Sequence, residues 1–222
     1  MSQYEIEIKS LLGSQEKADA LKEKIKAKGA VVIAQNKQLN HYFVINDIEK
    51  FKERATTLVS SADQDRLNKI LAEGSNFSIR TRDTDGKVVL VIKASIGSDT
   101  SANGVSRMEF EAEVSMSLDE LDKALLENGL DYQAKWSRER EEYKLGEAHI
   151  CLDKNAGYGY LAEFERVVAD RSLADSTKRD LLELMQGCGV EELVQDRLER
   201  MFAYYNANWR DYYGTDKVFN IQ

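Results

Sequence analysis

The sequence is poor in the residues and segments that mark several common protein classes. It has no proline and only two cysteines, Cys151 and Cys188. No run of about 18 apolar residues is present, which excludes an ordinary transmembrane helix. The opening residues, MSQYEIEIKS, lack the apolar stretch of a signal peptide. Two cysteines in a chain without a secretion signal are expected to stay reduced, so we expect a cytoplasmic protein with no membrane partner.

Histidine is as scarce as cysteine, and its placement argues against a structural zinc site. The only histidines are His41 and His149, and neither they nor the cysteines fall into a typical zinc-ligand spacing.

The chain also lacks a surplus of positive charge. It has 31 Lys and Arg residues against 39 Asp and Glu residues, a formal net charge of -8. Such a surface repels phosphate backbones at long range, so we expect no nucleic-acid partner. A small polyanion can still bind where Lys and Arg gather locally. With 222 residues, 42% hydrophobic and 32% charged, the chain has the composition of a soluble globular protein.

What the sequence does contain is a series of β-strand patterns interrupted by helical ones. Glu5, Glu7 and Lys9 alternate with Ile6 and Ile8, the period of a strand. Further strands are expected at 31–45, 76–83, 87–95, 106–115, 135–145, 148–153 and 158–168. Helices are expected at 15–28, 117–128 and 172–208, and the charged stretch 47–73 is helix-like. The sequence therefore predicts an α+β fold.

Most of these strands have one apolar face and one charged face. The charged positions are Glu5, Glu7, Lys9, Arg80, Arg82, Lys93, Arg107, Glu109, Glu111, Arg138, Arg140, Asp153, Glu163 and Glu165. Residues two apart on a strand point the same way, so each pair shares a face. Either these faces meet water over an apolar core, or the sheet closes around them and helices cover the apolar side. The second arrangement needs buried charges to be paired, with basic residues opposite acidic ones.

This ordered set of charges resembles the CYTH superfamily, also called triphosphate tunnel metalloenzymes. The opening Glu5-x-Glu7-x-Lys9 is similar to the signature of the family. Arg80-x-Arg82, Lys93, Arg107-x-Glu109-x-Glu111, Arg138-x-Arg140, Asp153 and Glu163-x-Glu165 follow in the order of the family. The family includes class IV adenylyl cyclases, thiamine triphosphatases and inorganic triphosphatases. The resemblance covers about three-quarters of the chain, 1–168.

The resemblance implies a closed antiparallel β-barrel of roughly eight strands, with a polar interior and helices packed outside. The tunnel domain would take 1–170, with 47–73 as a helical insertion. Residues 171–222 would form a C-terminal helical extension packed on it. This extension is longer and more aromatic than is usual in the family, and it would either close the tunnel or form a homodimer contact.

The resemblance also implies roles for individual residues. The metal ligands would be Glu5, Glu7, Asp153, Glu163 and Glu165, of which Glu5, Glu7 and Glu165 would be catalytic. The substrate-binding residues would be Lys9, Arg80, Arg82, Lys93, Arg107, Arg138 and Arg140. Glu109 and Glu111 would have a secondary role, either binding a second metal or orienting the basic side chains. Lys135 falls out of phase with Arg138 and Arg140.

The implied reaction is metal-dependent hydrolysis of a small triphosphate-bearing molecule. Carboxylates suit Mg²⁺ or Mn²⁺, and Arg suits bidentate contact with phosphate oxygens. The substrate would be inorganic triphosphate, thiamine triphosphate or a nucleoside triphosphate. Two alternatives remain open: an adenylyl cyclase that forms cyclic AMP and pyrophosphate from ATP, and a non-catalytic module that binds polyphosphate or nucleotide.

Overall fold

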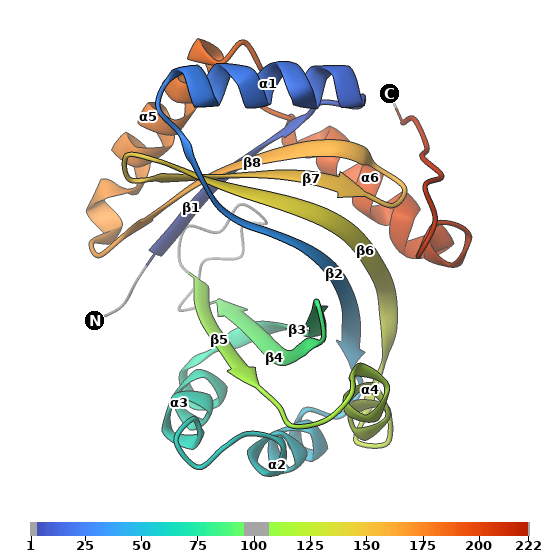
Figure 1. Ribbon diagram of the computed structural model, residues 1–222. Coiled ribbons are helices and arrows are strands. Elements are labelled where there is room, and N and C mark those ends of the chain that lie inside the picture. The colour runs from blue at the N-terminus through green and yellow to red at the C-terminus, as the bar shows by residue number, and fades with distance from the viewer. Residues whose placement is uncertain (1–3, 96–106, 222) are drawn as a thin grey trace. The chain divides into compact units, whose positions relative to one another are not determined.

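Eight strands and six α-helices make up the computed structural model, which describes residues 4–95 and 107–221 (Figure 1). The strands are β1 (Tyr4–Leu11), β2 (Val31–Ile45), β3 (Ser75–Thr84), β4 (Lys87–Ser95), β5 (Arg107–Glu113), β6 (Leu130–Leu145), β7 (Ala148–Asn155) and β8 (Gly159–Val168). The helices are α1 (Gln15–Ala27), α2 (Ile48–Leu58), α3 (Gln64–Glu73), α4 (Leu118–Leu126), α5 (Ala174–Gly187) and α6 (Gln195–Asn208), with short 3-10 turns η1 (Arg171–Leu173) and η2 (Trp209–Asp211).

The strands form one sheet in the order β1-β8-β7-β6-β2-β3-β4-β5. The α+β class and the eight antiparallel strands are therefore confirmed. The order ends at β1 and β5, and within the described residues these two strands are not paired with each other. The closed barrel expected from the sequence is not confirmed.

The chain divides into two compact units, which are described separately. Unit 1 comprises the described residues up to Lys37 and those from Ser137 onward, and unit 2 comprises Gln38–Trp136. Strands β2 and β6 contribute residues to both units.

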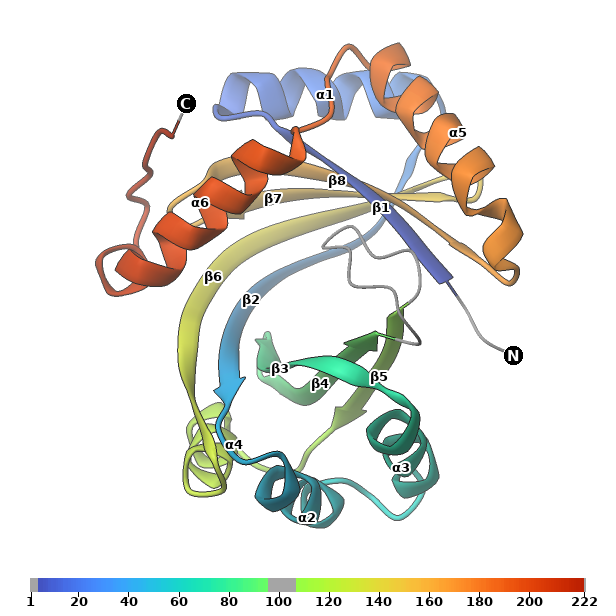
Figure 2. The ribbon, with the colours of Figure 1, turned by 180° about the vertical axis from the view of Figure 1, so that it is seen from behind.

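The core of unit 1 lies between its strands and two helices. Figures 1 and 2 show α1 and α5 on the same side of β1, β7 and β8. The buried side chains of these strands include Ile8, Ile150 and Phe164, and the helices bury Leu21 and Leu181. Because side chains alternate along a strand, the charged residues of the same strands lie on the opposite face.

Unit 2 is built on the same principle, with helices α2, α3 and α4 on one side of β3, β4 and β5 (Figure 1). Its core cluster includes Ile79 and Phe110 from the strands and Phe51, Leu67 and Leu121 from the three helices. The range 47–73 thus contains two helices that bury apolar side chains in this core. In both units the apolar faces of the strands are covered by helices.

Local signals in the sequence explain several element boundaries. Helix α1 begins after Ser14, whose side chain accepts a hydrogen bond from the backbone N–H of Lys17. The chain leaves α1 through Gly29, with φ of 95°. Asp85 and Gly86 join β3 to β4 with φ of 50° and 91°, the left-handed pair that a tight hairpin requires.

The aromatic C-terminal segment packs within unit 1 on the turn between β7 and β8. The backbone N–H of Gly157 donates to the carbonyl of Lys217, and that of Phe219 donates to the carbonyl of Gly157, each at 2.8 Å. The Phe219 ring lies 5.3 Å from that of Tyr158 and 4.8 Å from that of Tyr204. None of the helices in the described ranges combines the length and apolar character needed to cross a bilayer.

Candidate active site

Three carboxylates meet on the charged face of unit 1. The register of β1 and β8 places Glu7 directly opposite Glu165, and Glu5 lies two residues before Glu7 on the same face. One carboxylate oxygen from each of Glu5, Glu7 and Glu165 lies within 4.8 Å of the other two. We call this group the carboxylate triad. It unites the three residues predicted to be catalytic.

The negative charges of the carboxylate triad lie close together, and their repulsion changes the pKa of Glu165. Burial, followed by the charges of Glu5 and Glu163, raises the pKa of Glu165 to about 7. Its carboxyl group also forms a hydrogen bond with Glu5. Three carboxylate oxygens that repel one another form a site that a hard divalent cation such as Mg²⁺ or Mn²⁺ binds well, because the cation neutralises their charge. The residues present therefore fit a divalent metal, which would replace the proton on Glu165.

The raised pKa of Glu165 predicts how the stability of the metal-free protein depends on pH. The unfolded chain loses this proton near pH 4.5, whereas the folded chain keeps it until about pH 7. A raised folded-state pKa contributes stability that is complete below the lower value and is lost as the pH rises through the higher one. Urea unfolding in EDTA should therefore show this contribution falling between pH 4.5 and about 7.

The matched variant for this measurement is Glu165→Gln, which cannot titrate. The unfolding free energy of the wild type, measured relative to that of Glu165→Gln, should fall across the same pH window, because only the wild type loses this contribution. A difference that stays constant with pH would contradict the raised pKa.

The two other predicted metal residues, Asp153 and Glu163, lie against arginines. Arg140 forms a bidentate contact with Asp153 (Nε to Oδ1 2.7 Å, Nη2 to Oδ2 2.6 Å) and also contacts Glu163 at 2.5 Å. Arg138 Nη1 lies 3.0 Å from Asp153 Oδ2, and Asp153 is only 1% exposed. Lys9 Nζ lies 3.1 Å from Glu163 and also contacts Glu7. The basic residues predicted in this unit are thus ion-paired with its acidic ones.

Glu163 and Glu165 show how two carboxylates on one strand face acquire opposite properties. Burial opposes ionisation of Glu163, but the charges of Lys9, then Arg140 and Arg138, hold its pKa well below the ordinary value. Glu165, two residues farther along β8, sits among carboxylates instead. Glu163 is therefore committed to the basic residues, whereas Glu165 is available to a cation.

The predicted basic residues of unit 2 form a second group on β3 and β4. Arg80 Nη1 donates to Tyr42 Oη at 2.7 Å, and the guanidinium lies 5.5 Å from the centre of the Tyr42 ring. Arg82 Nε donates to Asn40 Oδ1 at 3.1 Å. The Nε–H of Arg80 is buried and has no hydrogen-bond partner among the described residues. Such a donor calls for an acceptor, and a phosphate oxygen is one that arginine binds well.

Glu109 and Glu111 on β5 lie beside these basic residues. Glu109 is 3.2 Å from Lys93 and 3.8 Å from Arg80, and Glu111 is 3.2 Å from Arg82. Of the two roles considered for them, these contacts match orientation of the basic side chains. Arg107 begins β5, but its side chain lies outside the described part of the chain.

Lys135 does not join either basic group. Its ammonium lies 3.7 Å from Asp122 of α4 and 4.2 Å from the centre of the Tyr132 ring. Asp122 is 1% exposed and also contacts His41 Nδ1, Thr81 Oγ1 and Tyr132 Oη, each at 2.6 Å. Lys135, which is out of phase with Arg138 and Arg140, thus contacts a polar network around the buried Asp122 of α4 instead.

Several contacts of the site were missed from the sequence. Asn40 and Tyr42 lie directly opposite Arg82 and Arg80 in the register of β2 and β3. Their spacing of two residues was a signal that they share the face of the arginines. His149 lies opposite Glu165 in the register of β7 and β8 and was not predicted as a site residue.

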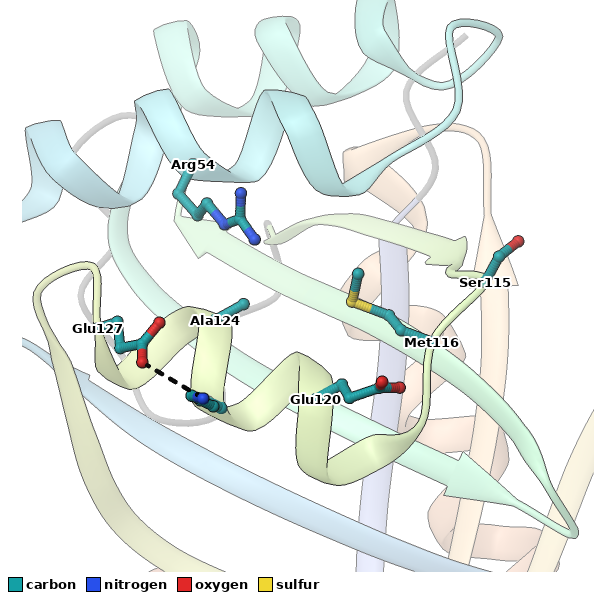
Figure 3. Close-up of a pocket in the computed structure, with 7 residues that line it drawn as sticks. Arg54, Ser115, Met116, Glu120, Ala124 and Glu127 are labelled. Atoms are coloured by element: carbon teal, nitrogen blue, oxygen red, sulfur yellow. Dashed lines mark ion pairs between the residues drawn. The ribbon is translucent and has the colours of Figure 1, made fainter.

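A hollow of about 360 Å³ in unit 2 lies apart from the predicted residues (Figure 3). It is lined by Arg54 of α2, by Ser115 and Met116, and by Glu120, Lys123, Ala124 and Glu127 around α4. None of the predicted site residues whose side chains the structure describes lines it, and we assign it no ligand.

Comparisons with known proteins agree with the family and the fold. A model of the CYTH domain matches residues 67–197. No curated protein matches the sequence.

Three examples of solved structures with this fold follow. The PH1012 protein from Pyrococcus horikoshii OT3 is 18% identical, with a TM-score of 0.61 over 84% of this chain and 91% of that one. A candidate adenylate cyclase from Vibrio parahaemolyticus is 16% identical, with a TM-score of 0.62 over 91% and 99%. HpAC1 from Hippeastrum, a candidate adenylyl cyclase with a dominant triphosphatase activity, is 14% identical, with a TM-score of 0.53 over 90% and 96%.

Proposed function

The chain belongs to the CYTH domain family, and on that premise we propose that it hydrolyses a small triphosphate with the help of a divalent metal ion. The observation that carries the proposal is the carboxylate triad of Glu5, Glu7 and Glu165 on β1 and β8. On the same two strands, Glu163 is paired with Lys9 of β1 and with Arg140 of β6. The triphosphatase activity described for HpAC1, which has the same fold, supports the reaction type.

In this proposal the carboxylate triad holds Mg²⁺ or Mn²⁺. The metal, when bound, neutralises phosphate charge and makes the terminal phosphorus easier to attack. Glu165, once it has lost its proton to the surroundings, adds a further negative oxygen donor to the triad. The side chains of the triad also accept hydrogen bonds from water, and this orients water for in-line attack.

Each unit has its own basic residues that suit phosphate oxygens. In unit 1 these are Lys9, Arg138 and Arg140, and in unit 2 they are Arg80, Arg82 and Lys93. Each is held in place by a carboxylate: Glu163 and Asp153 in unit 1, and Glu109 and Glu111 in unit 2. Prepositioned cations stabilise the charge that develops on the phosphate oxygens without first having to reorient.

The partner is a free small molecule rather than a nucleic acid. The net charge of -8 disfavours a long phosphate backbone, whereas a single triphosphate needs only the local basic groups. The three substrates that fit this description are inorganic triphosphate, thiamine triphosphate and a nucleoside triphosphate.

The test is a panel of these substrates with purified protein and Mg²⁺ or Mn²⁺. We expect orthophosphate release that stops when EDTA is added, and the relative kcat/KM values will identify the preferred substrate. Glu147→Gln is the matched control for variants of the triad, because Glu147 is exposed in the turn before β7. Tight triphosphate binding without turnover of any substrate would contradict the proposal and favour a binding module.

A further inference from the structure

His149 stands next to the carboxylate triad. In the sheet, Glu7 of β1 faces Glu165 of β8, and Glu165 faces His149 of β7. The three residues therefore form one row across three neighbouring strands. Directly opposed residues on one face of antiparallel strands have Cβ atoms roughly 4.5–5.5 Å apart, so their side chains are within reach of one another.

The side-chain atoms are close as well. His149 Nδ1 lies 3.6 Å from Glu165 Oε1, a distance too long for a hydrogen bond but close to that between two ligands of one metal ion. The His149 side chain is 40% exposed, whereas Glu165 is 21% exposed. The His149 ring is thus partly open to solvent, and a change of side-chain rotamer moves its nitrogens while the backbone stays in place.

The His149 side chain has no other role in the site as described above. On its far side, His149 faces Lys144 of β6, whose side chain is exposed. The other histidine of the chain, His41, is in unit 2 and only 2% exposed, with Nδ1 held at 2.6 Å by Asp122. The two histidines thus differ sharply: His41 is fixed in a buried polar network, and His149 borders a cluster of negative oxygen donors.

We propose that His149 is a nitrogen ligand of the metal ion held by Glu5, Glu7 and Glu165, and that it makes this site selective for Mn²⁺ over Mg²⁺. The inference rests on the proposed function, since it needs the triad to bind a metal. Imidazole nitrogen is a good ligand for the first-row transition metals, whereas Mg²⁺ prefers oxygen ligands and retains several water molecules. Adding one nitrogen to three carboxylates therefore shifts preference toward Mn²⁺.

The test is electron spin-echo envelope modulation of the protein loaded with Mn²⁺, which detects a nitrogen nucleus bound directly to the ion. The wild type should show the ¹⁴N coupling of a coordinated imidazole. Because the chain has only two histidines, loss of this signal in both His149→Ala and His149→Asn assigns it to His149. Titration calorimetry should show Mn²⁺ affinity falling roughly tenfold or more in His149→Ala, with Mg²⁺ affinity changed by less than about twofold.

The outcomes separate this inference from the proposed function. Mn²⁺ binding without ¹⁴N coupling, or a coupling that persists in His149→Ala, would overturn the role of His149 and leave the metal site intact. Failure of the wild type to bind Mn²⁺ would overturn the role of His149, and failure to bind either Mn²⁺ or Mg²⁺ would overturn both. A histidine signal in a protein that hydrolyses none of the triphosphates would support the ligand and refute the hydrolase.

Discussion

Replacing Glu165 with Gln is expected to lower kcat for triphosphate hydrolysis by more than about 100-fold. Mutating a residue that only hydrogen-bonds to a metal ligand already lowers metal affinity or activity by roughly 10–100-fold, and Glu165 is proposed to be a ligand itself. Gln keeps the size of the side chain but removes the charge that the triad offers to a cation. Glu165 is the member of the triad that faces both Glu7 and His149 in the sheet. Steady-state kinetics at several Mn²⁺ concentrations measures the loss.

Two comparisons make this result interpretable. Glu147→Gln removes the same charge from an exposed turn of the same unit and should leave kcat within about twofold, as expected for a surface position. Glu163→Gln should act differently from Glu165→Gln, because Glu163 pairs with Lys9 and Arg140 and not with the triad. Its main effect should be on KM for the substrate. Equal kcat in wild type and Glu165→Gln would show that the triad takes no part in catalysis.

Arg140→Ala is expected to be the most destabilising single change at the site. The Arg140 side chain is 11% exposed and holds Asp153, which is 1% exposed, as well as Glu163. Removing one partner of a buried ion pair costs roughly 3–5 kcal/mol. Without Arg140, Asp153 keeps its contact with Arg138 and loses the bidentate one. At about 2–4 °C per kcal/mol for a chain of this size, Tm should fall by about 6–20 °C. Differential scanning calorimetry measures this change.

A surface ion pair provides the contrast. Lys123 of α4 and Glu127, the residue that follows α4, lie 3.9 Å apart, and their side chains are 75% and 63% exposed. A dashed line marks this ion pair in Figure 3. Lys123→Ala should cost only about 0.3–0.5 kcal/mol, as exposed pairs one helical turn apart usually do. Arg140→Lys should fall between the two, because lysine keeps the charge but cannot form the bidentate contact. Similar Tm values for Arg140→Ala and Lys123→Ala would mean that the buried network contributes little to stability.

Local patterns in the sequence were sufficient for much of the fold. Alternation of charged and apolar residues marks β1, because a strand directs neighbouring side chains to opposite faces. Ser14 and Gly29 mark the ends of α1, and Asp85-Gly86 marks a hairpin, because each requires a particular backbone geometry. The grouping of the strands into one sheet followed from the resemblance to a family.

The contacts within the site depend on strand register, which a single sequence does not reveal. A shift of two residues in the pairing of β1 and β8 would place Glu163 opposite Glu7 instead of Lys9, and Glu163 would lose the charge that contributes most to its low pKa. His149 was overlooked for the same reason, since a lone histidine gives no ligand spacing until β7 is aligned with β8. The burial of Asp122 could not be predicted either, because an aspartate on an amphipathic helix is normally exposed to solvent. In the structure Asp122 is buried.

The measurement that tests the central claim most directly is ³¹P NMR of the products formed from ATP by the wild-type protein with Mn²⁺, recorded after the paramagnetic ion has been removed on a chelating resin. The proposed hydrolysis predicts that ADP and orthophosphate appear together, and that neither forms with Glu165→Gln or after addition of EDTA. Cyclic AMP with pyrophosphate would contradict hydrolysis and identify a cyclase. An unchanged ATP spectrum, with inorganic triphosphate and thiamine triphosphate also left intact, would contradict catalysis altogether.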